Sequence, residues 1–328
     1  MKNNSLAAGF GVRPITWSDL EAVQQVIYTA CKADGTESLA PTLEELAMDW
    51  RSPDFNPATD AWVGTSPGGK VIGYEIFENR FAHASLQGDG YVDPEFLGLG
   101  VGSRLLELLE ARARQEMPLA APDLRVFIRN TLGKTENNAR AIHEEAGFKP
   151  IRFSWQMEIS LEADPPAAVW PQNIELRPFE LARHDHPVYL ADEEAFLDHW
   201  GHTPGTFETW QTYISGHPDF DPALWFIAWD GDRAAGYALC RLRHGIGWVG
   251  KLGVRPAWRK QGLGMALLKH SFRQFYAQGY TTIGLSVDAS NPTGATRLYE
   301  RAGMHVTSQF VTYEKELRPG REPDEENN

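Results

Sequence analysis

Two stretches near the end of the chain carry residue types suited to chemistry on a phosphorylated or activated molecule. The first, "VRPAWRKQGLGMALL", joins an apolar run to a run with helical periodicity through a turn that holds two glycines, Arg259 and Lys260. The second, "LSVDASNPTGATRLYERAGM", brings Asn291 and Tyr299 to another strand-to-helix passage. Both stretches place polar groups where a helix begins, and this is where backbone N–H groups can bind an anion.

The glycine turn predicts a phosphate cradle. The first N–H groups of a helix have no intrahelical partner, and the helix dipole adds positive potential there. Gly262 and Gly264 allow close approach of an anion and positive φ. The turn lacks the GxxxxGK of a Walker A loop, and Leu267 stands where a dinucleotide motif has its third glycine. A nucleotide-phosphate enzyme is therefore disfavoured, and a turn that simply needs glycine is the alternative to an anion site.

Together the two stretches resemble the GCN5-related N-acetyltransferase (GNAT) family. Its acetyl-CoA loop reads Arg/Gln-x-x-Gly-x-Gly/Ala after a strand, which Arg259, Gly262 and Gly264 match. Its second motif is an Asn, then a helix with Leu-Tyr, then Gly-Phe. The matching residues here are Asn291, Ala295, Leu298, Tyr299 and Gly303, with Met304 in place of Phe. The resemblance covers nearly the whole chain, once in each half.

The resemblance implies an acetyl-CoA-dependent N-acetyltransferase that needs no metal. Pyrophosphate would lie on the N–H groups of the glycine turn, and the pantetheine arm would pair with residues 252–254. The implied cofactor-binding residues of the second half are Leu252, Gly253, Val254, Arg259, Lys260, Gln261, Gly262, Leu263, Gly264, Met265 and Asn291. The resemblance also implies that Tyr299 protonates the departing thiolate or donates a hydrogen bond to it. A core aromatic is the alternative interpretation of Tyr299.

The general base is harder to place. Many GNAT relatives carry a carboxylate on the strand before the phosphate loop, but residues 247–252 contain no Asp or Glu. The segment "ADEEAFLDHWGHTP" offers Asp192, Glu193, Glu194, Asp198, His199 and His202. Among them we expect His199 and Glu194 to take part, since His titrates near neutral pH. A solvated acidic helix face is the competing interpretation. The histidine pairs of the chain lack the converging ligands of a metal site.

The sequence contains an internal repeat of domain length. "VRPITWSDL" at Val12 is answered by "LRPFELARH" at Leu176, and "PDFNPA" at Pro53 by "PDFDPA" at Pro218. The proline-containing stretch "LEADPPAAVWPQN" between the copies indicates a linker. We expect a GNAT-like domain over 1–160, a linker over 161–173, a second GNAT domain over 174–318 and a disordered tail over 319–328.

Each copy predicts the element order β-α-α-β-β-β-α-β-α-β. The fold class is therefore α/β (α+β), with two tandem domains that each have a mixed central sheet flanked by helices. In the first copy the implied cofactor-binding residues are Val92, Gly98, Gly100 and Gly102. Leu97 replaces the loop Arg, His143 stands at the Tyr299 position and Thr135 at the Asn291 position. We expect the first half to be non-catalytic. Two alternatives remain: both halves are active, with His143 as acid, or the protein senses acetyl-CoA without turnover.

Composition narrows the possible partners. The net charge of −13 argues against nucleic acid as the main partner, because phosphate binding needs basic patches. The two cysteines form no disulfide or zinc pattern. The N-terminal segment lacks the apolar core of a signal peptide, and no apolar run is long enough to span a membrane. We expect a cytoplasmic monomer that acts on a small-molecule amine or a peptide.

Overall fold

The computed structural model describes residues 6–197, 199–200, 205–217, 219–290 and 294–323. The chain folds into two compact units. The first consists of Met1–Phe153 and Ser308–Asn328, and the second of Ser154–Thr307. Within the described residues, no helix combines the length and apolar character that crossing a membrane requires.

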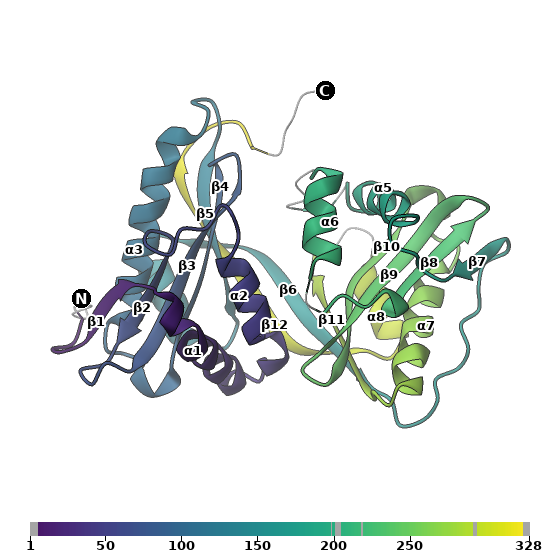
Figure 1. Cartoon of the computed structure of the whole chain (residues 1–328), viewed down its shortest axis with the longest axis horizontal. Helices are drawn as coiled ribbons and strands as arrows, with labels where there is room; N and C mark the ends of the chain where they lie inside the picture. Colours follow the sequence, from purple (N-terminus) through teal and green to yellow (C-terminus); the bar gives the residue numbers. More distant parts are fainter. Residues whose placement is uncertain (1–5, 198, 201–204, 218, 291–293, 324–328) are drawn as a thin grey trace. The chain divides into compact units, whose positions relative to one another are not determined.

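The first copy of the repeat contains six strands and four α-helices among its described residues (Figure 1). In chain order they are β1 (Gly11–Pro14), α1 (Leu20–Ala33), α2 (Leu43–Trp50), β2 (Ala61–Thr65), β3 (Val71–Phe81), β4 (Ser85–Val92), α3 (Val101–Glu116), β5 (Val126–Gly133), α4 (Asn137–Glu145) and β6 (Lys149–Ser160).

The second copy repeats this order (Figure 1). Its elements are β7 (Ile174–Arg177), α5 (Asp185–Phe196), α6 (Phe207–Ser215), β8 (Trp225–Asp230), β9 (Arg233–Arg243), β10 (Ile246–Val254), α7 (Leu263–Ala277), β11 (Thr282–Asp288), α8 (Ala295–Arg301) and β12 (His305–Arg318). The predicted order and the mixed α/β class are confirmed. α8 begins at Ala295, after Gly294 in the left-handed conformation at φ 75°.

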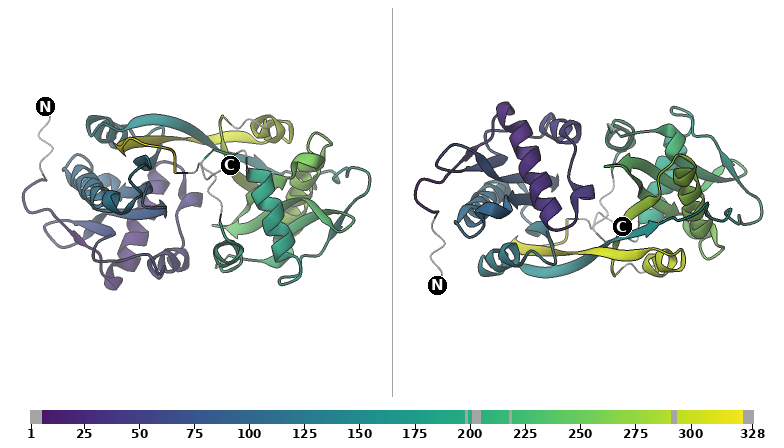
Figure 2. Two further views of the ribbon diagram at one scale, coloured as in Figure 1. Left: turned by 90° about the horizontal axis from the view of Figure 1, so that it is seen from above. Right: turned by 90° about the horizontal axis from the view of Figure 1, so that it is seen from below.

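Helices cover both faces of the sheet in each unit, as the views in Figure 2 show. In the second unit, alternate residues of β8 serve the two faces: Ile227 packs toward α5 and α6, and Ala228 packs toward α7. A strand buried on both faces reads as a continuous apolar run, which is why "LWFIAW" lacks polar alternation. Gly231, at φ 58°, lies in the tight turn of the hairpin between β8 and β9.

Within the described residues, one pair of neighbouring strands in each unit runs parallel, and the other strand pairs of the two orders below are antiparallel. The strand order is β1-β2-β3-β4-β5-β12 in the first unit and β7-β8-β9-β10-β11-β6 in the second. The parallel pairs are β4 with β5 and β10 with β11. Helices α3 and α7 follow the first strand of each parallel pair, so each glycine turn lies at the carboxyl end of that strand.

The last strand of each copy completes the sheet of the other unit. β12 pairs with β5, which places Val311 opposite Leu132 and buries Tyr313 in the core of the first unit. β6 pairs with β11, and its Met157 is buried in the core of the second unit. The expected boundaries at 160 and 174 follow the sequence repeat, whereas the compact units exchange these strands. Sequence periodicity predicts a strand but not its partner, because pairing is a long-range contact.

The described part of the expected disordered tail is anchored to the first unit. The N–H of Arg321 donates to the carbonyl of Asp123 at 2.8 Å, and the N–H of Arg125 donates to the carbonyl of Arg321 at 2.7 Å. Backbone pairing therefore holds Arg321 of this tail against residues 123 and 125 of the first unit. Residues 324–328 lie outside the described residues.

Candidate functional site

The glycine turn of the second unit has the geometry of a helix-start cradle. β10 leads into a 3₁₀ turn at Pro256–Trp258, and α7 begins after Gly262 at φ 89°. The first intrahelical bond runs from the N–H of Ala266 to the carbonyl of Gly262 at 3.0 Å. The N–H groups of the three residues before Ala266 are those that a helix start leaves for an external acceptor. These residues are Leu263, Gly264 and Met265.

The two glycines of the turn meet different requirements. Gly262 adopts the left-handed region, where any side chain is strained. Gly264 does not; a Cβ there would lie 3.2 Å from Leu298 Cδ1 and 3.7 Å from Val254 Cγ2. Gly264 therefore lets α7 pack closely against β10 and α8. The second glycine is needed for packing before any anion is considered.

The basic residues of the turn are used unequally. Arg259 donates from Nε to the carbonyl of Val254 and from Nη2 to the carbonyl of Ala195, both at 3.0 Å. It thereby ties the end of β10 to α5. Gln261 donates to the carbonyl of Ala257 at 3.0 Å, and Lys260 is exposed at φ 62°. The Arg259 guanidinium thus holds the turn in shape, a role that the motif alone did not suggest.

β10 and β11 separate beside this turn. They pair only at Gly247 with Ile283 and at Trp248 with Gly284. Beyond that point β10 continues along β9 as far as Val254, with a bulge between Val249 and Lys251. Residues 252–254, expected to contact the pantetheine arm, therefore lie in the part of β10 that has left β11. A bulge re-aims backbone groups and is frequent next to active sites.

Tyr299 lies on α8, and its ring is buried in the core of the second unit. Burial raises the pKa of the Tyr299 hydroxyl to about 12. Among the described residues, no group hydrogen-bonds to this hydroxyl. Met304, which replaces the family's Phe, is also buried. Asn291, the expected pantetheine partner, lies outside the described residues.

The model of the acetyltransferase (GNAT) family matches the chain twice, over residues 23–148 and 177–304. The chain belongs to the GNAT family. It is an acetyl-CoA-dependent N-acetyltransferase with two GNAT domains in tandem, as the two motifs predicted.

Known proteins are similar to this chain over most of its length. The mycothiol acetyltransferase of Catenulispora acidiphila is 27% identical over 92% of this chain and 97% of its own length. The mycothiol acetyltransferase of Streptomyces scabiei is 31% identical over 77% of each chain. A solved GCN5-related N-acetyltransferase from Sphaerobacter thermophilus is 35% identical, covers 97% of this chain and 99% of its own, and superposes with a TM-score of 0.82. The tandem GNAT protein from the clavulanic acid biosynthesis pathway, at 16% identity, covers 95% of this chain and all of its own; its TM-score of 0.70 shows the shared fold.

The two residues expected to act as the general base, Glu194 and His199, have different contacts in the structure. Glu194 accepts a hydrogen bond from Arg255 Nε at 2.6 Å, so its carboxylate is already paired. His199 is partly exposed, its Nδ1 is 3.1 Å from the carbonyl oxygen of Trp200, and its ring packs near Phe196. Asp198 and His202 lie outside the described residues. A catalytic role for His199 and Glu194 stays a prediction.

Asp192 is the buried acid of this segment. It accepts hydrogen bonds from Tyr237 Oη at 2.5 Å, Trp210 Nε1 at 2.8 Å and Lys251 Nζ at 2.5 Å. Burial raises the pKa of the Tyr237 hydroxyl well above its usual range. With three donors, Asp192 fixes the strand position of Lys251 and is not available as an acceptor of a substrate proton.

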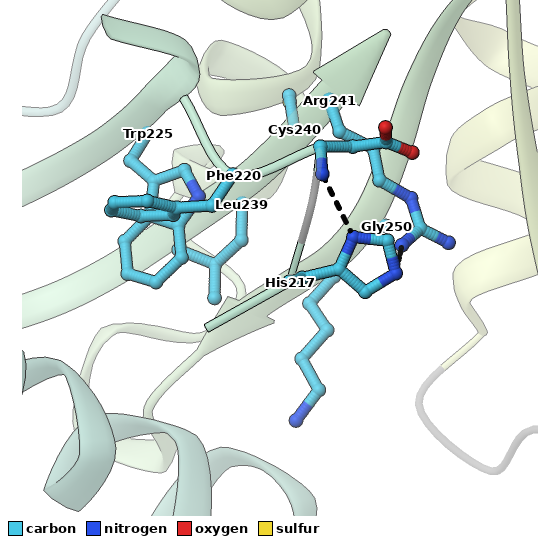
Figure 3. Close-up of a pocket in the computed structure, with 9 residues that line it drawn as sticks. His217, Phe220, Trp225, Leu239, Cys240, Arg241 and Gly250 are labelled. Atoms are coloured by element: carbon cyan, nitrogen blue, oxygen red, sulfur yellow. Dashed lines mark hydrogen bonds between the residues drawn. The ribbon is translucent and has the colours of Figure 1, made fainter. Parts of the chain in front are cut away.

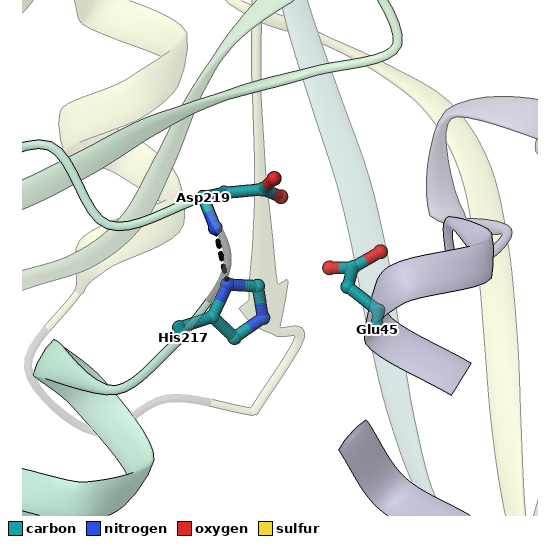
Figure 4. Close-up of side chains that lie close together, drawn as sticks. All are labelled: Glu45, His217 and Asp219. Carbon is teal, nitrogen blue, oxygen red and sulfur yellow. Dashed lines mark hydrogen bonds between the residues drawn. The ribbon is translucent and has the colours of Figure 1, made fainter. Parts of the chain in front are cut away.

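A pocket that sequence reasoning missed lies beside β9 and β10 (Figure 3). It has a volume of about 220 Å³ and is lined by His217, Asp219, Phe220, Trp225, Leu239, Cys240, Arg241, Gly250 and Lys251. His217 accepts the backbone N–H of Asp219 at Nδ1, at 3.2 Å, as Figure 4 shows. Glu45, also drawn there, belongs to the first unit, where its carboxylate closes the capping box of α2. The signal for this pocket was the repeated "PDFDPA" motif, which contains Asp219.

The first unit keeps the backbone of the cradle. α3 begins after Gly100 at φ 81°, and Gly98 has φ 78°. A Cβ on Gly102 would lie 3.3 Å from Ile142 Cδ1. β4 and β5 pair only from Ser85 to Gln87 on the β4 side, so Val92 lies beyond the paired region. The exposed Leu97 supplies no charge where the second unit has Arg259.

His143 does not replace Tyr299 as an acid. Its Nδ1 is 2.8 Å from the carbonyl oxygen of Ala139, which can only accept, so the proton lies on Nδ1. Burial lowers the pKa of His143, which favours the neutral ring. The buried Nε2 therefore has no proton to donate, and it has no partner among the described residues. Thr135 donates at 3.5 Å to Asp34.

A carboxylate does occupy the strand before the first glycine turn. Asp89 of β4 stands at the position of Lys251, 162 residues earlier, the same offset as Gly100 to Gly262. Burial raises the pKa of Asp89 to about 7, and Tyr91 donates to its Oδ2 at 3.0 Å. Glu136, whose pKa burial also raises to about 7, accepts the N–H of Gly133. The carboxylate that many GNAT relatives carry on this strand is therefore present in the first copy, as Asp89, and absent from the second.

Proposed function

We propose that the second unit of this acetyltransferase transfers the acetyl group from acetyl-CoA to a primary amine of a small molecule or peptide. One contrast carries the assignment to this unit. The Tyr299 hydroxyl has a proton and no hydrogen-bond partner among the described residues, whereas His143 presents a ring nitrogen without a proton. A leaving thiolate needs a donor, and only the second unit offers one at this place.

The residues of the second unit fit the cosubstrate. The helix start at Leu263, Gly264 and Met265 offers backbone donors for pyrophosphate, and exposed Lys260 adds charge beside them. The stretch of β10 beyond Trp248 has no β11 partner, so its backbone remains able to pair with an amide-bearing pantetheine arm. Arg259 supports the turn by donating hydrogen bonds to the carbonyls of Val254 and Ala195.

The chemistry follows from these groups. An acceptor that enters as an ammonium first loses one proton to water. The neutral amine then forms a bond to the acetyl carbon as the C–S bond breaks, and its nitrogen loses one further proton, which passes toward the leaving thiolate to give CoA. Backbone N–H groups at the β10 bulge are suited to hold the developing oxyanion, a contribution of about 2.7–4 kcal/mol per donor in related sites. With the Tyr299 pKa at about 12 and a thiol near 8.5, full proton transfer is uphill by roughly 5 kcal/mol. Tyr299 therefore acts as a hydrogen-bond donor to the thiolate.

A small-molecule acceptor is supported by the relatives. Two similar proteins are named mycothiol acetyltransferases, and they match this chain over most of their length. These two relatives are 27% and 31% identical to this chain, and binding residues lie disproportionately on loops, which vary more between homologues than the elements they connect. The acceptor of this chain is therefore proposed as an amine class rather than as mycothiol precursors specifically.

The first unit is proposed as a non-catalytic partner. Its cradle backbone is intact, which also supports the second candidate role, acetyl-CoA binding without turnover at that unit. The alternative in which both halves are active is disfavoured because Nε2 of His143 carries no proton to donate to a leaving thiolate.

The test combines cofactor counting with turnover. Native mass spectrometry with saturating acetyl-CoA gives the number bound per chain, and CoA release with a panel of primary amines gives activity. Gly264→Glu should abolish turnover and remove one bound cofactor, because it fills the cradle and adds negative charge there. The matched variant Gly102→Glu should keep turnover. Loss of turnover with Gly102→Glu alone would move the activity to the first unit, and no release with any amine would reject the proposal.

A further inference from the structure

The pocket beside β9 and β10 contains two buried polar atoms whose bonding needs are unmet. Oδ2 of Asp219 and Nε of Arg241 are buried, and neither has a hydrogen-bond partner among the described residues. Both residues line the pocket. Buried polar groups normally have partners, so such atoms are expected where a ligand completes the bonding.

The two atoms need hydrogen-bond partners of opposite kinds, a donor for Asp219 and an acceptor for Arg241. A carboxylate oxygen only accepts, so Asp219 is suited to an ammonium group. A guanidinium N–H only donates, so Arg241 is suited to a carboxylate, which a guanidinium binds with charge-assisted hydrogen bonds. One small molecule that carries both groups would satisfy both residues.

The other polar residues of the pocket hold this pair in place. His217 accepts the backbone N–H of Asp219 at 3.2 Å, and Arg241 Nη1 lies 3.0 Å from His217 Nε2. Lys251 already donates to Asp192 at 2.5 Å, so its charge is balanced within the unit. Arg241 is thus the cation of the pocket whose buried N–H remains unmatched.

The remaining walls are apolar. The rings of Phe220 and Trp225 meet edge to face with centroids 5.0 Å apart, and Leu239 lies beside them among the lining residues. Figure 3 shows these three side chains grouped on one side, apart from His217 and Arg241. The pocket therefore has a charged end and an apolar end. An apolar substituent on the ligand would be buried against the aromatic rings.

We propose that this pocket is the acceptor site of the second unit and that it selects an amine that also carries a carboxylate, an amino-acid-like zwitterion. The ammonium group binds Asp219, the carboxylate binds Arg241, and the side chain lies against Phe220 and Trp225. The inference rests on the proposed function and narrows its acceptor class. It adds no covalent step to the transfer already described.

Matched pairs of acceptors test the carboxylate. L-alanine, L-leucine and L-phenylalanine are each compared with ethylamine, isoamylamine and 2-phenylethylamine, which lack only that group. Binding to the full chain saturated with CoA is measured by calorimetry, and turnover by CoA release with acetyl-CoA. We expect at least one amino acid to bind about tenfold or more tightly than its amine. Absence of any such preference overturns the inference.

Variants assign the preference to the two residues. Arg241→Gln should raise KM for the preferred amino acid about tenfold and leave KM for its amine unchanged. Asp219→Asn should raise KM for both members of the pair. Arg243→Gln is the matched control: it lies on the same strand two residues further on and is not among the lining residues. Equal loss with Arg241→Gln and Arg243→Gln would overturn the assignment.

The two proposals fail differently. If amines are acetylated with no effect of a carboxylate, the acceptor class is wrong and the proposed function stands. If amino acids bind with the expected preference but CoA is never released with any amine, the proposed function fails and the binding site stands.

Discussion

The two units carry opposite charges at the same place of the same fold. Asp89 lies on β4 of the first unit and Lys251 at the equivalent position on β10 of the second. Asp89 is bonded to Tyr91, and Lys251 is bonded to Asp192. The units also differ on the helix that follows the next strand. Tyr299 on α8 of the second unit has a protonated hydroxyl, whereas His143 on α4 of the first unit has no proton on Nε2.

This difference between the units shows that the fold requires the glycines of the turn, whereas it does not require one particular side chain at the expected catalytic positions. Gly100 and Gly262 share positive φ, and Gly102 and Gly264 share close packing against a neighbouring helix. These needs belong to the fold and persist whether or not phosphate binds. The side chains at the Tyr299 and Lys251 positions differ between the units, although the backbone around them is the same. A retained glycine turn is therefore weaker evidence of activity than a retained proton donor.

The largest expected effect is on turnover. Tyr299→Phe should lower kcat by about 10²-fold or more, within the range of a lost proton donor, with acetyl-CoA affinity unchanged. His143→Gln in the first unit should leave kcat within about twofold. Steady-state CoA release checks both. Equal losses from the two substitutions would mean that the units share the reaction and would break the comparison.

The exchanged strands give the next effect. Tyr313→Ala should destabilise the first unit by about 3–5 kcal/mol, because the ring is fully buried there although it belongs to the second copy. Met157→Ala should destabilise the second unit by about 2–5 kcal/mol for the same reason. Hydrogen exchange followed by mass spectrometry should show faster exchange in β2–β5 for the first variant and in β8–β11 for the second. The reverse pattern would contradict the strand exchange.

The buried carboxyl group of Asp89 in the first unit predicts that the stability of the protein depends on pH. The pKa of Asp89 is about 7 in the folded chain and its ordinary value is 3.8, so the folded state binds the proton more tightly. Stability should therefore fall as pH rises from about 4 to about 7. Asp89→Asn should remove this part of the fall and gain roughly 2–3 kcal/mol at pH 8 relative to pH 5. Urea unfolding at both pH values measures it; an identical gain at both would show that Asp89 does not titrate in this range.

The smallest effect concerns the missing cation of the first cradle. Leu97→Arg should tighten acetyl-CoA binding at the first unit by no more than about fivefold, because an exposed charge pair is worth about 1 kcal/mol or less. Calorimetry in a Gly264→Glu background isolates that unit. A larger gain would indicate that the first cradle lost its function through this position alone.

The sequence by itself determined the repeat, the element order and the positions of both glycine turns. Apolar periodicity and turn residues are local, so the hairpin at Gly231 and the helix after Gly262 could be predicted from neighbouring residues. The GNAT motifs placed Tyr299 on its helix, which the structure shows as α8.

Only the tertiary structure decided which groups meet. β6 and β12 find partners in the other copy because strand pairing depends on distant segments. Arg259 bonds to a carbonyl of α5, and Glu194 is held by Arg255, contacts between residues more than sixty positions apart. The pocket likewise brings together Asp219, from the loop before β8, and Arg241, from β9. Burial then set the protonation of Tyr299, His143 and Asp89, because desolvation depends on surroundings that residue spacing does not describe.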